Sequence, residues 1–345
     1  MSTAQATTQE PVGVMARKVP TLSIIVPVFN EQAAIAPFLR RAIASATSAL
    51  GVDKETDEYE FVFVDDGSTD ATAAELVVAR EHCECLRIVV LSRNFGKDAA
   101  LTAGLHYARG AAVLLMDVDL QDPPELIPAM LQKWREGAKV VNAVRDDRRL
   151  ENWGKRWTAA AFYSAYNRLA ERPIPRQASD FRLLDRQVVE VLQRLPERVR
   201  FMKGLYSWVG FSTAEVRYTR DARSSGKSKW TFLRLWTYAL DGITSSTTTP
   251  LRIWTYLGGS IALLAFIYAL FIVVDTLVFG RTTPGYASLI TVVLTLGGLN
   301  LVALGILGEY LGRIFNEVKA RPLFLVQSTV GFEASVGSVT EQPDD

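Results

Sequence analysis

The chain has 345 residues, a formal net charge of +1 and a hydrophobic fraction of 49%. Its length fits one large domain or two smaller ones, and its balanced charge excludes an overall electrostatic attraction to nucleic acid. We therefore expect no nucleic-acid partner. Residues 1–20 are polar and small and contain no apolar core of a secretory signal. They are predicted to be a disordered tail.

Short apolar runs alternate with helical patterns between Leu22 and about Gly137. Continuous β-branched runs separated by helices indicate a parallel sheet that is covered on both faces. We therefore predict an α/β fold, Rossmann-like with a mostly parallel sheet, in a domain spanning residues 21–216. The predicted strands are 22–29, 61–64, 87–91 and 112–116, and the helices between them begin near 35, 70 and 99.

A polar cluster follows each of these four predicted strands. Ligands of such sheets bind at the carboxyl ends of the strands, so these clusters are expected to meet at one edge. Their convergence is the main evidence for a binding site that comes from the residues alone. The clusters are Asn30-Glu31, Asp65-Asp66, Arg93-Asn94 and Asp117-Val118-Asp119.

The Asp117-Val118-Asp119 sequence is the candidate metal site. In extended geometry residues i and i+2 point to the same side, so both carboxylates can face one ion. Oxygen ligands without nearby His or Cys favour Mg²⁺ or Mn²⁺ over zinc, and Gln121 could supply a third oxygen. An isolated Asp-x-Asp sequence is often only a solvated turn. The position of this one at the end of a predicted strand favours the metal site.

Three local features have structural interpretations. Asp122 fits a helix N-cap, with Glu125 as its capping-box partner, and this interpretation is favoured over a catalytic one. Asp70 can N-cap a helix that runs through Ala79. Cys83 and Cys85 offer too few ligands for structural zinc and are predicted to be two reduced thiols.

Two basic groups are expected to meet phosphates, because the other clusters are mainly acidic. Arginine forks match phosphate oxygens. Solvated surface, or general attraction to anionic lipid, is the alternative for some members of each group. The first group is Arg145, Arg148, Arg149, Lys155 and Arg156, and the second is Arg220, Arg223, Lys227 and Lys229.

Two apolar stretches, 253–274 and 282–308, contain no Asp, Glu, Lys or Arg. Both exceed the roughly 18 residues that mark a membrane-spanning candidate. Residues 251–316 are therefore predicted to be a two-helix transmembrane hairpin, preceded by an interfacial amphipathic segment at 217–250. Flanking basic residues place the α/β domain and both termini in the cytosol. Residues 317–345 form the predicted cytosolic tail, disordered after about Gln327.

Together these motifs resemble the polyprenyl-phosphate glycosyltransferases, inverting enzymes of glycosyltransferase family 2 with the GT-A fold. The resemblance covers about residues 20 to 325, and Phe201-Met202-Lys203-Gly204 and Trp208-Val209-Gly210-Phe211 are similar to the bacterial bactoprenol glucosyltransferase subgroup. The other motifs that carry it are Pro27-Val28-Phe29-Asn30-Glu31, Asp65-Asp66-Gly67-Ser68, Arg93-Asn94-Phe95-Gly96-Lys97, residues 117–124, Ser225-Gly226-Lys227-Ser228-Lys229 and residues 308–313.

The resemblance implies transfer of one sugar, glucose from UDP-glucose above all, to undecaprenyl or another polyprenyl phosphate at the inner membrane. It places Mg²⁺ or Mn²⁺ at Asp117, Asp119 and Gln121. The acceptor phosphate or the diphosphate would meet Arg145, Arg156, Arg223, Lys227 and Lys229. Asp180 matches a position near the transferred sugar, where we expect it to orient the sugar rather than act as a base. The implied nucleotide-binding residues are Pro27, Phe29, Glu31, Asp65, Asp66, Lys97 and Asp117.

Two other functions remain open. A processive polysaccharide synthase of the same fold would carry a Gln-x-x-Arg-Trp motif, which the sequence lacks. A nucleotide-binding membrane regulator without catalysis would differ only in turnover. The sequence leaves the formation of a homo-oligomer open.

Overall fold

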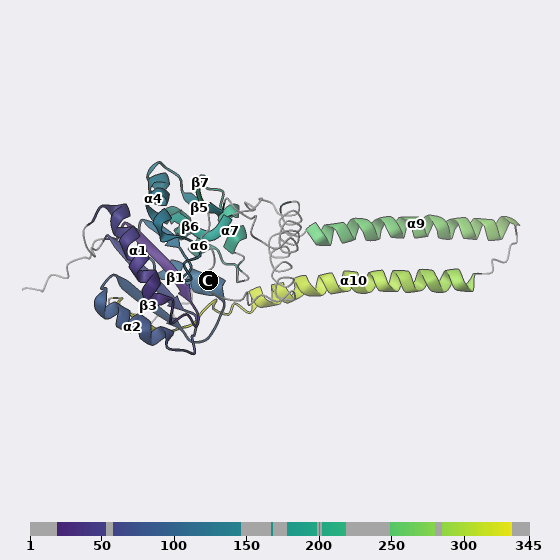
Figure 1. The fold of residues 1–345 in the computed structure, drawn as a ribbon. Helices are drawn as coiled ribbons and strands as arrows, with labels where there is room; N and C mark the ends of the chain where they lie inside the picture. Colours follow the sequence, from purple (N-terminus) through teal and green to yellow (C-terminus); the bar gives the residue numbers. More distant parts are fainter. Residues whose placement is uncertain are drawn as a thin grey trace, which may run out of the picture.

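The computed structural model describes residues 19–52, 58–145, 167, 178–198, 200, 202–218, 249–279 and 285–332. Within these ranges one eight-stranded sheet carries helices on both faces, and two long helices project away from it (Figure 1). The strands are β1 Leu22–Val28, β2 Tyr59–Asp65, β3 Leu86–Leu91, β4 Ala112–Leu115, β5 Val140–Arg145, β6 Ala178–Asp185, β7 Thr213–Tyr218 and β8 Val326–Val330. The helices are α1 Ile35–Leu50, α2 Thr72–His82, α3 Lys97–Tyr107, the short 3-10 helix η1 Pro124–Leu126, α4 Ile127–Arg135, α6 Arg186–Arg194, α7 Met202–Trp208, α9 Thr249–Phe279 and α10 Tyr286–Val318.

The strand order is β7-β5-β6-β4-β1-β2-β3-β8. Strands β1 to β4 are parallel, whereas β6 runs antiparallel to both of its neighbours, β4 and β5. Strand β7 is parallel to β5, and β8 is antiparallel to β3. All strands except β6 and β8 therefore share one direction, which confirms the predicted α/β fold with a mostly parallel sheet.

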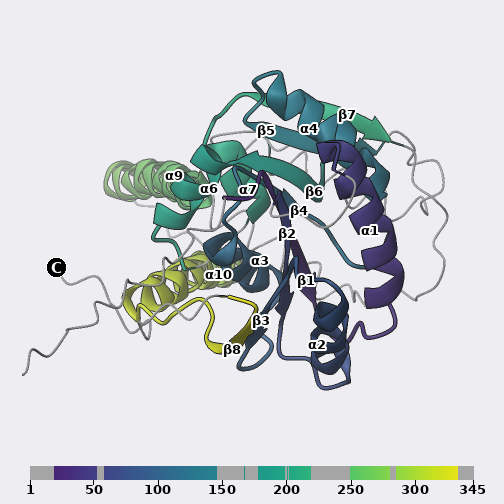
Figure 2. The same ribbon diagram turned by 90° about the vertical axis from the view of Figure 1, so that its left-hand side faces the viewer.

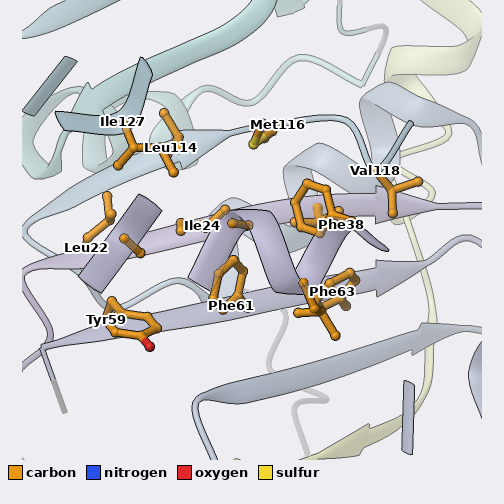
Figure 3. Packing of buried hydrophobic residues seen from close by; sticks show 14 of the residues in the cluster. Leu22, Ile24, Phe38, Tyr59, Phe61, Phe63, Leu114, Met116, Val118 and Ile127 are labelled. Atoms are coloured by element: carbon orange, nitrogen blue, oxygen red, sulfur yellow. The ribbon is translucent and has the colours of Figure 1, made fainter. Parts of the chain in front are cut away.

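Helices cover both faces of the sheet, and this explains why its central strands are apolar throughout. Figure 2 shows α1 and α2 on one side and α3, α6 and α7 on the other. On the α1 side, Ile24 of β1 and Phe61 and Phe63 of β2 lie under Phe38 (Figure 3). The Phe38 ring meets Phe63 edge to face, with ring centroids 6.0 Å apart. The next residue of β1, Ile25, packs into the opposite core with α3.

The chain beyond Gln327 does not match its prediction. Residues 326–330 form β8, which pairs with β3 at the sheet edge (Figure 2). The backbone N–H of Ser92 also donates to the carbonyl of Leu325 at 2.9 Å. Local composition gave no sign of this strand, because β3 supplies the hydrogen-bonding groups that order it. The prediction of disorder is therefore wrong for this part of the tail, and the sheet domain takes a strand from beyond residue 216.

The cysteine prediction is also wrong. Cys83 and Cys85 form a disulfide, with an S–S distance of 2.09 Å. The turn between α2 and β3 brings their Cα atoms to 5.3 Å, within the usual range for a disulfide. The N-cap prediction for Asp70 is wrong, because the N-cap residue of α2 is Ala71, which makes no side-chain cap hydrogen bond. Asp70 accepts the N–H of Thr72, the first residue of α2, at 3.0 Å, and α2 continues to His82 rather than ending near Ala79.

Helices α9 and α10 extend side by side from the sheet domain (Figure 1). Thr295–Val318 is long and apolar enough to cross a membrane, whereas the apolar stretch Tyr256–Ile272 is shorter. Two spans therefore stay a prediction. The far end of α10 returns to the sheet domain, where the Glu317 carboxylate accepts the N–H of Arg198 at 2.9 and 3.0 Å. Most of the predicted interfacial segment, residues 219–248, lies outside the described residues.

Candidate active site

The candidate site lies at one edge of the sheet. Because β1 to β4 are parallel, the polar residues that follow them meet at their shared carboxyl edge. Strand β6 runs the other way, so it begins at this edge and brings Asp180 there. Strand β5 ends at the same edge with Arg145, whose side chain lies outside the described residues.

Two consecutive carboxylates after β2 hold the neighbouring loops together. Asp65 accepts the backbone N–H of Ser68 at 3.0 Å. Asp66 accepts the N–H groups of Phe95 and Gly96 at 2.7 and 2.9 Å. Both carboxylates are buried, and burial is the largest cause that raises the pKa of Asp66. The hydrogen bonds of Asp66 therefore hold the loop after β2 against the loop after β3.

Gly67 allows these two loops to approach closely. Its φ of +67° lies in the left-handed region, and a Cβ there would come within 2.4 Å of the Arg93 carbonyl carbon. Only glycine tolerates both conditions. The position of the Arg93-Asn94-Phe95-Gly96 loop beside the site therefore depends on this glycine.

The loop after β1 exposes an aromatic ring at the same edge. Phe29 is 40% exposed, and Pro27 precedes it in β1. Asn30 has a φ of +54°, and its side-chain oxygen accepts the N–H of Thr69 at 2.8 Å. The N–H of Glu31 donates to the Thr72 hydroxyl at 2.9 Å. These contacts fix the loop so that Phe29 is presented as a flat apolar surface.

The carboxylate oxygens of Asp117 and Asp119 are the type of ligand that Mg²⁺ or Mn²⁺ prefers. Val118 is buried in the core beside Phe38 (Figure 3), so the carboxylates on either side of it face away from the core. No group of three or more His, Cys, Asp or Glu that could hold a metal occurs among the described residues. Such an ion is typically bound by one or two carboxylates together with substrate phosphates. The donor set of Asp117 and Asp119 is of that kind.

Gln121 lies beside Asp119, as a third ligand would require, but here it contacts the carboxylate itself. Its side-chain amide donates to Asp119, and its backbone N–H donates to the other carboxylate oxygen at 3.1 Å. Leu120 between them has a φ of +54°, a conformation that costs energy and is frequent at functional sites. The loop thus holds the Asp119 side chain in one orientation.

The capping-box prediction for Asp122 and Glu125 is wrong. The 3-10 helix η1 begins at Pro124, and it has no side-chain cap. Asp122 instead accepts the hydroxyl of Tyr218 from β7, and Glu125 forms a two-pronged ion pair with Arg41 of α1 at 2.9 Å. Long-range partners occupy both carboxylates, and these contacts cannot be read from local spacing.

A lysine joins the two acidic parts of the site. The Lys97 ammonium lies 2.7 Å from Asp117 Oδ1 and 3.0 Å from Asp180 Oδ2. A second lysine, Lys203 of α7, lies 3.2 Å from Asp180 Oδ1. Asp180 is therefore held between two cations, one from each side of the site.

These contacts shift the pKa values of the site. Burial raises the pKa of Asp117, and the nearby carboxylates of Asp180 and Asp119 raise it further, against the effect of Lys97. Burial also acts to raise the pKa of Asp180, but Lys203 and Lys97 outweigh it and hold that pKa well below its usual range. Burial, followed by the Asp180 charge, raises the pKa of Asp98 to about 6.

The region around β6 and α7 contains residues that the sequence did not single out. Arg182 of β6 is buried with its guanidinium 4.1 Å from the centre of the Tyr206 ring. Lys203 was noted only as part of a motif, although a basic residue in a short, otherwise uncharged helix was an available signal. Apart from Arg145, the basic candidates lie outside the described residues: Arg148, Arg149, Lys155, Arg156, Arg220, Arg223, Lys227 and Lys229.

Comparison with known proteins places this geometry in a family. Residues 23–192 match the model for glycosyl transferase family 2, and residues 249–314 match the GtrB C-terminal hairpin. The chain is 47% identical over 312 residues to an uncharacterized glycosyltransferase of Synechocystis sp., covering 90% of this chain and 96% of that relative. It is 44% identical to the SfII prophage-derived bactoprenol glucosyl transferase of Shigella flexneri, covering 89% and 98%. A prophage bactoprenol glucosyl transferase homolog of Escherichia coli is 43% identical, with the same coverage. The chain belongs to glycosyl transferase family 2, with a GT-A-like α/β domain followed by a GtrB-type C-terminal hairpin.

Proposed function

We propose that this protein is a metal-dependent hexosyltransferase that moves one glucose from UDP-glucose to undecaprenyl or another polyprenyl phosphate, with inversion at the sugar carbon. The observation that carries the proposal is the convergence of Asp117, Asp119, Lys97 and Asp180 at the carboxyl edge of a family 2 domain. Relatives named bactoprenol glucosyl transferase match this chain over 98% of their length and support the acceptor and the sugar.

The donor would lie across the loops after β1, β2 and β4. Phe29 offers a ring on which a base can stack, and Pro27, Glu31, Asp65 and Asp66 complete the nucleoside site. Asp117, Asp119 and Gln121 would hold Mg²⁺ or Mn²⁺ beside the diphosphate. When bound, such an ion neutralises the charge that develops on the departing nucleotide.

The acceptor needs positioning more than deprotonation. A phosphate monoester has a second pKa near 6, so at neutral pH it is already largely an oxyanion. Arg145 and Arg156, with Arg223, Lys227 and Lys229, would bind this phosphate or the diphosphate. Asp180 is held by two lysines, which keep it ionised and make it a weak base. It would therefore orient the sugar.

The two long helices would place the site at a bilayer. Leu263, Phe266 and Leu301 are more than 60% exposed, as expected for side chains that face lipid. We propose two spans in the inner membrane, an interfacial segment at 217–250, and a catalytic domain and termini in the cytosol. A lipid-borne acceptor then reaches the site without leaving the membrane. Assembly into a homo-oligomer would add spans without changing this arrangement.

Two alternative functions differ from the proposed one in what they would form. A processive synthase would build a polymer, but the sequence has no Gln-x-x-Arg-Trp motif, and two spans are too few to line a channel. A non-catalytic regulator would bind nucleotide without turnover, yet the carboxylates of the proposed metal site are present.

The test is a donor panel with purified full-length protein, undecaprenyl phosphate and Mg²⁺ or Mn²⁺, with and without EDTA. UDP-glucose is expected to give a single-sugar lipid, and EDTA is expected to stop its formation. Polymer would support the synthase, and nucleotide binding without product would support the regulator. Absence of product with every nucleotide-sugar would refute the enzyme assignment. Full activity in EDTA would refute only the metal requirement.

A further inference from the structure

Lys97 places a positive charge between the carboxylates of Asp117 and Asp180. It begins α3, and its ammonium lies 2.7 and 2.8 Å from the two carboxylate oxygens of Asp117. The same ammonium lies 3.0 Å from Asp180. The ammonium thus compensates the charge of both carboxylates.

A divalent ion and this ammonium would compete for the same carboxylate. An ion held by Asp117 would repel a positive charge that lies within 3 Å of its carboxylate oxygens. The ammonium contacts both oxygens, so its charge would oppose the ion, and loosening of the Asp117–Lys97 pair would favour ion binding. Lys97 would therefore affect metal binding at Asp117 as well as nucleotide binding.

The surroundings allow Lys97 to leave Asp117 without losing all of its partners. Its side chain is 40% exposed. Asp180 would remain a partner after Asp117 turns to the ion. A diphosphate that arrives with the ion would offer the ammonium further negative oxygens.

We propose that Lys97 is a resident counter-cation that competes with the divalent metal for Asp117, so that the metal binds weakly until a nucleotide diphosphate draws the lysine away. This inference rests on the proposed metal site at Asp117 and Asp119. It makes metal binding and nucleotide binding mutually dependent, because each one weakens the contact that opposes the other. The site would thus disfavour a metal ion without its nucleotide.

The test measures Mn²⁺ affinity of the detergent-solubilised full chain by electron paramagnetic resonance, without nucleotide. Lys97→Met is expected to bind Mn²⁺ at least about tenfold more tightly than the wild type, and Lys97→Arg to bind like the wild type. Lys203→Met is the matched control, because Lys203 pairs with Asp180 on the other side of the site. It removes the same charge and is expected to change the affinity much less. Adding UDP should strengthen Mn²⁺ binding more in the wild type than in Lys97→Met.

The inference would be overturned if Lys97→Met bound Mn²⁺ no more tightly than the wild type. It would also be overturned if Lys97→Met and Lys203→Met increased the Mn²⁺ affinity equally. Absence of Mn²⁺ binding in the wild type and in every variant would overturn it as well. The enzyme assignment would then still be decided by a separate measurement of glucose transfer. Asp119→Asn should remove the Mn²⁺ signal and so locate it at this site. If Lys97→Met does not fold, amine labelling of the wild type decides: Mn²⁺ should speed the modification of Lys97 relative to Lys203, and an unchanged ratio would contradict competition.

Discussion

The two halves of the sheet build the site in different ways. In the β1–β4 half the strands are parallel, and Phe29, Asp66 and Asp117 lie in the loops at their carboxyl ends. In the β5–β7 half the strands run in mixed directions, and Asp180 comes from the beginning of β6, while Lys203 comes from a short helix. Lys97 of the first half bridges them through Asp117 and Asp180. In the proposed function, the first half would bind the nucleotide and the metal, and the second half would position the sugar and the acceptor.

The largest effect should come from Asp119, the proposed metal ligand of the first half. Asp119→Ala is expected to abolish metal-dependent glucose transfer, a loss of at least about 10³-fold, because a preorganised charge partner of the transition state is lost. Initial rates at saturating UDP-glucose and Mn²⁺ measure the loss. Glu136→Ala, which removes an exposed carboxylate at the end of α4, should retain activity. Transfer by Asp119→Ala at near wild-type rates would remove Asp119 from the metal site.

A smaller effect on activity should distinguish Arg145 from Asp180, both of which lie in the second half of the sheet. Arg145→Ala is expected to lose about 10²-fold in kcat/KM because the phosphate loses its positioning charge. Asp180→Asn should lose less, about tenfold, because it keeps the shape of a side chain that orients the sugar. Rates measured between pH 6 and 9 test the assignment. A larger loss in Asp180→Asn, with a changed pH profile, would mean that a carboxylate base is needed.

A matched glycine pair tests whether the loops of the first half depend on close approach. Gly67 and Gly51 have the same φ of +67°, but a Cβ has open space only at Gly51. Gly51→Ala should therefore cost about 1 kcal/mol, from backbone strain alone. Gly67→Ala should cost about 2 kcal/mol more, because the new methyl group overlaps the Arg93 backbone. Denaturant unfolding of both variants measures the difference; equal losses would refute the close approach.

The segment after α10, which contains β8 and Phe332, should contribute modestly to the stability of the sheet domain. Phe332 lies against Tyr107 of α3, with ring centroids 5.0 Å apart. Phe332→Ala is expected to destabilise the sheet domain by about 1 kcal/mol, through loss of this aromatic contact. Leu325→Ala removes a side chain that is 54% exposed and should change the stability by less than about 0.5 kcal/mol. Equal effects on the melting temperature would argue against docking of this segment.

The smallest effect should be a pH dependence at Asp98. The pKa of this carboxyl is raised from 3.8 to about 6, so its ionisation opposes folding. That cost is absent below about pH 4 and is complete once the pH has passed 6. Asp98→Asn should therefore raise Tm at pH 7.5, and the gain should shrink as the pH falls from 6 towards 4. A gain that stays constant with pH would contradict the raised pKa.

Local patterns predicted the first half of the sheet well. Buried β-branched runs marked β1 to β4, because strands covered on both faces are apolar throughout, and the polar residues after them were expected at one edge. The same patterns failed where a partner distant in the chain decides the structure. Strand β8 is ordered by β3, and Asp122 is occupied by Tyr218 rather than by a helix N-terminus.

The lysines at Asp180 show the same limit within the site. Spacing could not indicate that Lys97 and Lys203, more than 100 residues apart in the chain, hold one carboxylate between them. The antiparallel pairing of β6 with β4 brings Asp180 to this edge, and such long-range pairings leave no local periodicity. The resemblance to a family pointed to Asp180, but only the structure identified its partners.

The most direct test of the central claim is the mass of the lipid product. Purified full-length protein is incubated with UDP-glucose, Mn²⁺ and undecaprenyl phosphate, and the lipid is extracted for mass spectrometry. The account predicts undecaprenyl phosphate that carries one hexose, and no product from undecaprenol, which lacks the phosphate. A ladder of added hexoses, or an unmodified lipid while UDP-glucose remains bound, would contradict it.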